Sequence, residues 1–445
     1  MIKTSLMIGI SSIDRILKIF LSALKKSFVS PYFGFIQGHD YLSKSTLKNI
    51  YALVGKDNDG VVNNFERMFS SLIGDGSSVA FAAGRMGFYC LMQEIGIKQG
   101  DHVVLQSSTC SVMVNAVLRI GAIPIYSDIN DNTFSSSVDD IKKVITNKTK
   151  LIVSQHSFGI PCDIEAISLF AKKRKVFLLE DCALTVGSSI NGKICGNFGD
   201  AALFSTDHSK PINTISGGLI YTNCTHLYHK LKNRQASSSR IKNKKQIKLW
   251  RQFNLERKYC NPKKYGKLRV TQLIYSNLFG LTRDVFTSSD YSSNIELNNK
   301  YPAKLPAFMA LIGIQEIDKW PERQNERRRV LEFISREIEF IFGKNLPGVY
   351  SDKYRDIIPL RLAWSCDEGI SIRKSLSSVV DMDSVWFLKP IVATNEPLIN
   401  FGYSMGVCPI SEKIGPNMIN IPCNISYDFA NVLIRKIKLI RGWSE

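Results

Sequence analysis

The stretch LFSTDHSKPINTISGG, residues 203 to 218, connects two short apolar runs, AALF and LIYTN. Apolar runs of this length, bounded by turn-forming residues, predict buried strands. Between them Lys210 precedes Pro211, which fixes the neighbouring backbone, and a glycine pair at 217–218 permits a sharp return into the next strand. The pattern predicts a lysine held on a connection between two core strands, with an ordinary solvated loop lysine as the alternative.

Upstream of this stretch, short β-branched runs alternate with helical patterns of about a dozen residues. The runs are HVVL, IPIYSDI, KLIVSQ and VFLLED. Such alternation is typical of βαβ units and predicts an α/β fold with a mainly parallel central sheet. Ligands of these sheets bind at the carboxyl ends of the strands. Two features fall at such ends: Asp181, which follows VFLLE, and the AAGRMG turn at 82–87, which opens a helical pattern.

The strand-end carboxylate and the glycine-containing turn indicate a chemistry when they are combined with the lysine. Glu180 and Asp181 are adjacent strand residues, so their side chains point to opposite faces and only one of them faces a pocket. The N–H groups at a helix N-terminus suit a phosphate group, although one such turn is a weak signal. A phosphate site, a carboxylate and a lysine after a later strand together predict a pyridoxal phosphate site.

The composition predicts a globular chain with a large core. The 445 residues include 44% hydrophobic and 22% charged residues, which favours about two domains. The ten cysteines show no CxxC or other metal-ligand spacing. We therefore expect no metal site. We also expect the protein to reside in a reducing cytoplasm. No apolar run approaches the roughly 20 residues that span a bilayer.

The net charge of +19 is spread unevenly along the chain. Residues 13–26 combine an apolar helical stripe with basic residues, which predicts a helix packed on the body or on a partner subunit, or else a helix on an anionic membrane surface. Residues 229–270 are basic, with Trp250, Phe253 and Tyr259 interleaved. Since no nucleic-acid motif accompanies them, we expect a solvated insertion or an electropositive rim, and no nucleic-acid partner.

Four stretches carry a resemblance to a known family. They are AAGRMGFYCLMQEIGIKQGDHVVL, GAIPIYSDI, HSFGIPCDIEAI and LLEDCALTVGSSINGKICGNFGDAALFSTDHSK. They resemble the DegT/StrS-type sugar aminotransferases of the aspartate-aminotransferase fold. The likeness covers about residues 60–225 and resumes near the carboxyl terminus with CPISEKIGPNMINIP.

The resemblance implies a role for each matching residue. Lys210 matches the lysine that forms a Schiff base with the aldehyde of pyridoxal phosphate, and Asp181 matches the carboxylate that faces the pyridine nitrogen. Ser205 matches a phosphate-binding hydroxyl. The phosphate-binding turn of the family matches the backbone amides of Gly84, Arg85 and Met86. Because an ordinary lysine has a pKa of about 10.4, the pocket must activate this amine by desolvation or by nearby cations.

Several positions depart from the family pattern. Leu184 stands where the family often has a glutamine near the ring oxygen, and Cys110 stands where an aromatic residue commonly stacks on the ring. Lys304 is the candidate for an arginine that the family takes from the neighbouring subunit. His208, two residues before the lysine, is a second candidate for a substrate contact. The insertion at about 230–300 is longer and more basic than the family leads us to expect.

Together these patterns predict a two-domain enzyme. We expect an amphipathic helix and lead-in over residues 1–44, a large cofactor domain over 45–325 and a small α/β domain over 326–445. The resemblance implies a pyridoxal-phosphate-dependent aminotransferase. It would move an amino group from an amino acid, with glutamate expected, to the keto group of a nucleotide-linked sugar for surface polysaccharide such as lipopolysaccharide. It also implies a homodimer, with peripheral contact at the inner face of the membrane as a further option.

Alternative functions stay open on the same fold. In a sugar dehydratase a histidine replaces the Schiff-base lysine, and His208 lies close to that position in the sequence. A catalytically lapsed relative is the second alternative, because Leu184 removes a hydrogen-bond donor from the cofactor. A membrane-surface or nucleic-acid binder that uses the basic insertion is the third.

Overall fold

The computed structural model describes residues 21, 36, 38–261, 264–265, 291–294, 301–343, 346–380, 382 and 386–440. The predicted amphipathic helix of residues 13–26 lies outside the described residues, apart from Leu21. Most of the second half of the predicted basic insertion also lies outside them.

The helices and strands follow in chain order. The helices are α2 (Lys44–Ala52), α3 (Asp59–Ile73), α4 (Gly84–Glu94), α5 (Ser111–Arg119), α6 (Val138–Val144), α7 (Ile164–Arg174), α8 (Thr225–Ser237), α9 (Asn243–Tyr259), α11 (Ala307–Phe342), α12 (Gly369–Leu376), α13 (Pro409–Ile414) and α14 (Tyr427–Ile440). The strands are β1 (Ser77–Phe81), β2 (His102–Gln106), β3 (Thr109–Cys110), β4 (Ile123–Ser127), β5 (Thr149–Gln155), β6 (Phe177–Asp181), β7 (Ser189–Ile190), β8 (Lys193–Ile194), β9 (Ala201–Ser205), β10 (Gly218–Thr222), β11 (Arg355–Asp356), β12 (Arg361–Ser365), β13 (Ile391–Val392) and β14 (Met418–Pro422).

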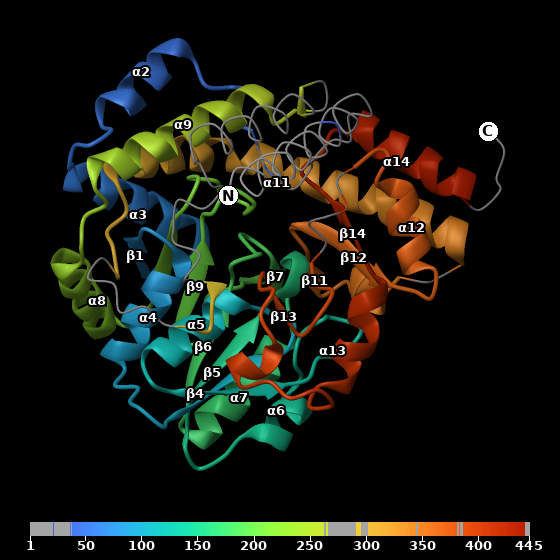
Figure 1. The fold of residues 1–445 in the computed structure, drawn as a ribbon, viewed down its shortest axis with the longest axis horizontal. Helices are drawn as coiled ribbons and strands as arrows, with labels where there is room; N and C mark the ends of the chain where they lie inside the picture. The colour runs from blue at the N-terminus through green and yellow to red at the C-terminus, as the bar shows by residue number, and fades with distance from the viewer. Residues whose placement is uncertain are drawn as a thin grey trace, which may run out of the picture.

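A seven-stranded sheet forms the centre of the molecule (Figure 1), in the order β1-β10-β9-β6-β5-β2-β4. The strands from β9 to β4 pair in parallel, whereas β10 runs antiparallel to both of its neighbours. The predicted α/β fold with a mainly parallel sheet is therefore confirmed. The runs predicted as strands from the sequence are β2, β4, β5, β6, β9 and β10, with bounds that differ by one or two residues.

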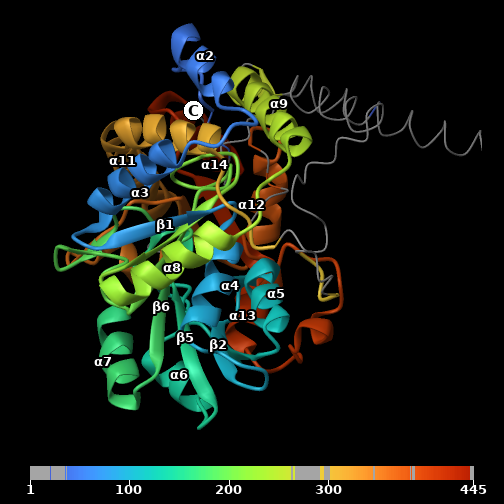
Figure 2. The same ribbon diagram turned by 90° about the vertical axis from the view of Figure 1, so that its left-hand side faces the viewer.

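Helices cover both faces of this sheet because side chains alternate along each strand. On β9, Leu203 packs in one core cluster, while Ala202 and Phe204 pack in another on the opposite face. In Figure 2, α7 lies on one side of β5 and β6, and α4 and α5 lie on the other side. The strands are thus buried on both faces, which explains why they read as continuous apolar runs in the sequence.

A second, smaller assembly follows the sheet in the chain (Figure 1). Strands β12 and β14 pair in antiparallel register, and α12 and α14 pack beside them. Helix α11 links the two parts: Phe308 and Ile312 pack in a cluster with α3, whereas Ile334 and Ile338 pack with β12 and β14. The division predicted between residues 325 and 326 falls inside this continuous helix, and it stays a prediction.

Two glycines bring the end of the central sheet against α4. Gly217 has φ of +142°, a conformation that side-chain-bearing residues rarely adopt. A Cβ on Gly218 would lie 2.4 Å from the Cα of Gly84, the first residue of α4. The glycine pair is therefore needed for the close approach of β10 to the amino terminus of this helix.

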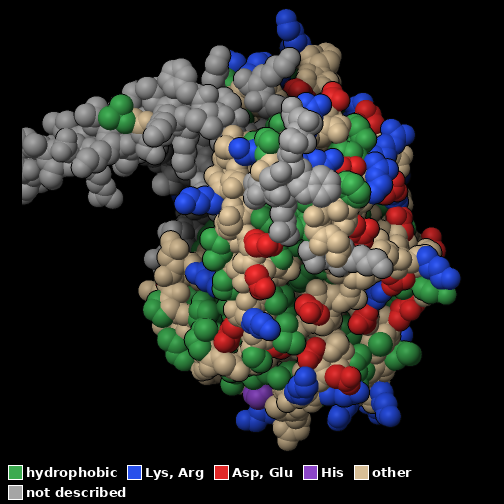
Figure 3. Space-filling view, turned by 90° about the vertical axis from the view of Figure 1, so that its right-hand side faces the viewer, with side chains coloured by type: hydrophobic (Ala, Val, Ile, Leu, Met, Phe, Trp, Pro, Cys, Tyr) green, Lys and Arg blue, Asp and Glu red, His purple; other side chains and the backbone are tan. Residues whose placement is uncertain are grey.

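The described part of the basic insertion folds into helices whose aromatic residues face the body. Phe253 on α9 is buried, and Trp250 is partly buried against the same core cluster. Lys244, Lys248 and Arg251 are exposed on the outer side of α9. On the face drawn in Figure 3, basic and acidic side chains are interspersed. Since the aromatic rings are used in packing, they are not available as a stacking platform for nucleic-acid bases.

All ten cysteines are free thiols. Among the described residues, none of the helices has both the length and the apolar character that crossing a bilayer requires.

Candidate active site

The loop that carries Lys210 is fastened on both sides. It leaves β9 and returns to β10, and the hydroxyls of Thr206 and Thr214 lie 2.7 Å apart across its base. The Thr214 N–H also donates to the Thr206 carbonyl at 2.9 Å. Further along, Asn213 Oδ1 accepts the N–H of Ile215, whose φ of +74° is a strained conformation for a β-branched residue. These contacts hold the loop in one conformation.

Lys210 is half-buried in this loop. Its Nζ lies 5.6 Å from the centre of the Trp386 ring. Burial lowers the pKa of Lys210, the negative charges of Asp207 and Asp181 oppose this shift, and the positive charge of Arg361 adds to it. A lowered pKa increases the neutral fraction of the amine, which is the form that acts as a nucleophile or accepts a proton.

Asp181 is buried at the carboxyl end of β6, as predicted. Its Oδ1 accepts the N–H of Ala183 at 3.0 Å. Burial raises the pKa of Asp181, while the Ala183 N–H and the charges of Lys210 and His156 oppose the rise. Among the residues that the structure describes, no cationic group lies at ion-pair distance from this carboxylate. Since burying an unpaired carboxylate is costly, this position favours a cationic ligand atom.

Glu180 faces the other side of the sheet, as the strand alternation requires. Its carboxylate accepts the N–H groups of Gly196, Phe198 and Gly199 at 2.6–2.8 Å. His156 Nε2 lies 3.1 Å from its second oxygen. Glu180 therefore holds the loop before β9 in place, and Asp181 alone is the acidic residue of this pair at the candidate site.

The amino terminus of α4 lies beside Ser205. A Cβ on Gly84 would lie 3.7 Å from the Ser205 Cβ. Ala83, the residue that precedes the helix, offers no side-chain oxygen to cap it. Arg85 and Met86 are buried in the first turn, and the Met86 N–H donates to the Ala83 carbonyl at 3.0 Å. A helix start beside a hydroxyl suits a phosphate group.

Cys110 and Leu184 are both placed near these groups by the fold. Cys110 ends β3, which pairs with β13 from the later part of the chain. Burial raises the pKa of Cys110, and the charges of Lys210, Arg85 and Asp181 all act on this thiol. Leu184 is buried three residues after Asp181. Their predicted places in the cofactor pocket stay predictions.

The two predicted substrate residues have different surroundings. The backbone of Lys304 pairs with Phe81 at the end of β1 and donates to the Ser239 carbonyl at 2.9 Å. This places it near the start of α4. His208 instead contacts α9: its Nδ1 lies 2.9 Å from Oε1 of Glu256. The basic insertion thus reaches the loop of Lys210, which the sequence did not predict.

We expect Glu256→Gln to destabilise the protein. Burial alone would raise the pKa of Glu256, but His208 and the hydrogen bond from Gln252 lower it below its ordinary value, so the buried carboxylate is ionised at neutral pH. Losing such a charge-assisted hydrogen bond costs about 1.5–3 kcal/mol. Urea denaturation would measure the change. Glu322→Gln is the control, since its exposed ion pair with Lys319 contributes little, and equal effects of the two changes would contradict the prediction.

Sequence reasoning missed the contribution of the small assembly to the site. Arg361 on β12 is buried, and burial lowers its pKa to about 9. Its Nη1 donates to Asn420 Oδ1 at 3.2 Å, and the same oxygen accepts the N–H of Trp386 at 2.6 Å. The Trp386 ring lies 5.6 Å from the Lys210 Nζ, and the charge of Arg361 acts on the same amine. The sequence carries no local signal for this, because the three residues lie 150 or more positions after the lysine.

The fold is that of known aminotransferases. The chain superposes on a putative sugar aminotransferase of Streptococcus pneumoniae, solved in its pyridoxal phosphate form, with a TM-score of 0.65 and 17% sequence identity. The match covers 90% of this chain and 97% of that one. At this identity the likeness establishes the fold.

Sequence comparison finds similar proteins over the central part of the chain. Residues 47–257 match the DegT/DnrJ/EryC1/StrS aminotransferase family, which confirms the predicted resemblance over this segment. A GDP-perosamine synthase of Escherichia coli O157:H7 is 38% identical over 169 residues, which is 37% of this chain and 46% of that protein. A dTDP-4-dehydro-2,3,6-trideoxy-D-glucose 4-aminotransferase of Saccharopolyspora spinosa is 34% identical over 168 residues, 37% of this chain and 44% of that protein. In sequence, the chain thus spans less than half the length of these relatives.

The residues present fit pyridoxal phosphate, the cofactor used in this family. The set of donors has the required chemistry: an amine with a lowered pKa on Lys210, a buried carboxylate on Asp181, and a helix start beside the Ser205 hydroxyl. Lys210 would hold the aldehyde carbon, Asp181 the pyridine nitrogen, and the start of α4 with Ser205 the phosphate.

Proposed function

We propose that this protein is a pyridoxal-phosphate-dependent aminotransferase. It moves an amino group from an amino acid, with glutamate as the expected donor, to the keto group of a nucleotide-linked sugar. The product would serve in the synthesis of a surface polysaccharide.

One observation carries the proposal: Asp181 ends β6, and the loop of Lys210 leaves the same end of β9, the parallel neighbour of β6 in the sheet. The names of the relatives support the substrate class, since one is a GDP-perosamine synthase and another acts on a dTDP-linked dehydro sugar.

The side chains of this chain have separable tasks in such a reaction. Pyridoxal phosphate, when bound, supplies the electron sink for carbanion formation. The Lys210 amine, whose pKa burial lowers, would take a proton from the donor's α-carbon onto its Nζ and would then release it to the cofactor carbon that carries the amino group. Asp181 supplies the negative charge that keeps the pyridine nitrogen protonated. The Trp386 ring, whose centre lies 5.6 Å from the Lys210 Nζ, would shield one side of this amine from water.

A dehydratase on the same fold is the alternative that the site supports less well. That reaction requires a histidine in place of the lysine. Here Lys210 is retained, and the His208 imidazole contacts Glu256 on α9 and lies 3.6 Å from Asp207. A catalytically lapsed relative is also less well supported, because the lysine and the carboxylate are both in place.

We also propose a homodimer in the cytoplasm, with peripheral contact at the inner face of the membrane. Support for the dimer comes from exposed apolar side chains close together in the sequence, at Ile399, Met405, Val407 and Ile410. The exposed cations on the outer side of α9 support contact with an anionic lipid surface.

The amino-donor reaction tests the proposed function. Purified protein loaded with pyridoxal phosphate should convert glutamate to 2-oxoglutarate in a single turnover, since the amino group stays on the enzyme until an acceptor arrives. Adding GDP- or dTDP-linked keto sugars should then give an amino sugar, detected by mass spectrometry, and allow further turnovers. Failure of every common amino acid to yield its keto acid, with cofactor demonstrably bound, would refute the aminotransferase proposal.

A further inference from the structure

A cleft of about 660 Å³ lies at the edge of the central sheet that is opposite to Lys210 and Asp181. Its walls come from the amino ends of β5 and β6, from the segment before β2 and from the end of α7. Strands β6, β5 and β2 are neighbours in the sheet. Phe177 in the wall of the cleft and Asp181 are the two ends of β6, which are about 13 Å apart at ~3.3 Å per residue. The cleft is therefore separate from the candidate active site.

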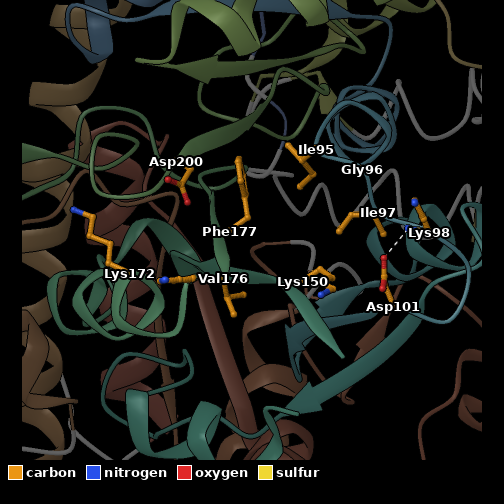
Figure 4. Close-up of a pocket in the computed structure, with 11 residues that line it drawn as sticks. Ile95, Gly96, Ile97, Lys98, Asp101, Lys150, Lys172, Val176, Phe177 and Asp200 are labelled. Atoms are coloured by element: carbon orange, nitrogen blue, oxygen red, sulfur yellow. Dashed lines mark hydrogen bonds between the residues drawn. The ribbon is translucent and has the colours of Figure 1, made fainter. Parts of the chain in front are cut away.

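The cleft is rich in exposed lysines. Its lining includes Lys98, Lys150, Lys172 and Lys175. All four are exposed, and within the described part of the chain none of their ammonium groups forms a hydrogen bond or an ion pair. Figure 4 shows Lys98 on one side of the cleft and Lys172 on the other, with Lys150 between them. Four like charges around one hollow repel one another, so an anionic ligand would stabilise the arrangement.

Two acidic residues of the cleft are already used by the backbone. Asp101 Oδ2 accepts the N–H of Lys98 at 2.8 Å, drawn as a dashed line in Figure 4. Asp200 Oδ2 accepts the N–H of Leu178 at 2.8 Å. Asp101 thus shapes the turn before β2, and Asp200 connects the turn before β9 to β6. They leave the cleft with a formal excess of positive charge, since four lysines face two aspartates.

The remaining lining is apolar. It consists of Ile95, Ile97, Val176 and Phe177, with Gly96. Phe177 is half-buried, and in Figure 4 its side chain stands between Asp200 and Ile95. The volume is within the range of about 300–1,000 Å³ that is usual for small-molecule pockets. A ligand with both anionic groups and a flat apolar part would match this lining.

An ordinary structural reason explains only part of the lysine cluster. Basic residues in the last turn of a helix interact favourably with its carboxyl terminus, and Lys172 is in the last turn of α7, with Lys175 as its C-cap. Lys98 and Lys150 belong to other elements and gain nothing from that helix. Their convergence on the same hollow needs a separate reason.

We propose that this cleft binds a nucleoside diphosphate as a second ligand site. The lysine ammonium groups would contact the two phosphates as point charges, and the base would lie against Phe177 and the aliphatic wall. This inference goes beyond the proposed amino transfer and does not depend on it, because the cleft is at the opposite edge of the sheet.

Calorimetric titration of ADP into the full-length protein, loaded with pyridoxal phosphate, tests the site. We expect saturable binding that the double variant Lys150→Glu/Lys172→Glu weakens at least tenfold. The control is Lys44→Glu/Lys48→Glu, which makes the same change of net charge on exposed residues of α2 and should leave binding unchanged. Pyrophosphate should bind more weakly than ADP, because it lacks the base.

A cross-linking experiment separates this site from a nucleotide site near Lys210. Irradiation with 8-azido-ADP, followed by peptide mapping, should label the segments 95–101 or 172–177. Labels confined to the segments around Gly84 or Lys210 would overturn the proposal, as would absence of saturable ADP binding or equal weakening in the two double variants. Pyrophosphate binding as tight as that of ADP would overturn the nucleotide assignment. Each of these results is independent of whether the protein transfers amino groups.

Discussion

Replacing Lys210 with alanine is expected to remove the visible absorbance of protein-bound pyridoxal phosphate and to lower amino transfer by more than about 10³-fold. The half-buried Lys210 lies on a fastened loop, and its pKa is lowered. It is therefore the amine that we expect to bond to the cofactor. Absorbance spectra, borohydride reduction with mass spectrometry and turnover assays would measure the effect, with circular dichroism to verify that the variant is folded.

Lys304→Ala is the matched control for this prediction. Lys304 lies near the same edge of the sheet, where its backbone pairs with Phe81, yet we expect its variant to keep the absorbance and the reducible link. Persistence of a borohydride-reducible link in Lys210→Ala, or its loss in Lys304→Ala, would show that another lysine holds the cofactor.

Asp181→Asn is expected to slow the reaction with an amino donor by roughly 10²- to 10³-fold, the range seen when one preorganised electrostatic group is removed. The amide keeps an oxygen that can accept the Ala183 N–H, which Asp181 Oδ1 accepts at 3.0 Å, so the fold should be retained. What is lost is the negative charge opposite the pyridine nitrogen. Single-turnover kinetics with glutamate would measure the rate, and thermal unfolding would report stability.

Glu180, the neighbouring carboxylate, provides the control, because its replacement should affect stability more than the reaction rate. Glu180→Gln should lower the free energy of unfolding by about 1.5–3 kcal/mol or more, since Glu180 accepts three backbone N–H groups through charge-assisted hydrogen bonds. Its effect on the single-turnover rate should be much smaller than that of Asp181→Asn. If Asp181→Asn turned over at a near-normal rate, Asp181 would not be the residue opposite the ring nitrogen.

Much of the central sheet could be predicted from local pattern. The runs around Val104, Ile152 and Leu179 read as strands because both faces of a parallel strand are buried, which gives short continuous apolar segments. Their alternation with helical patterns predicted the parallel pairing. The roles of Lys210 and Asp181 came from the resemblance to a family together with their place after strands.

Other features of the site depend on contacts that sequence periodicity does not report. His208 was considered as a substrate contact, but its nearest ionic partner is Glu256 on α9, 48 positions later. Arg361 and Trp386 were not considered at all, although the charge of Arg361 acts on Lys210 and the Trp386 ring lies 5.6 Å from its Nζ. Lys304 was considered for its charge, and its position beside β1 was not foreseen.

By itself the sequence determined six strands of the central sheet and the residue types that end them, because burial on two faces and turn chemistry act over a few neighbouring residues. Only the tertiary structure decided what surrounds those residues. The pKa of Lys210 depends on burial and on charges contributed by Asp207 and Arg361, one of them 151 positions away. Likewise, the lysines of the second cleft meet only because β2, β5 and β6 lie side by side in the sheet. Electrostatic interactions depend on distance in space, and folding sets that distance independently of separation along the chain.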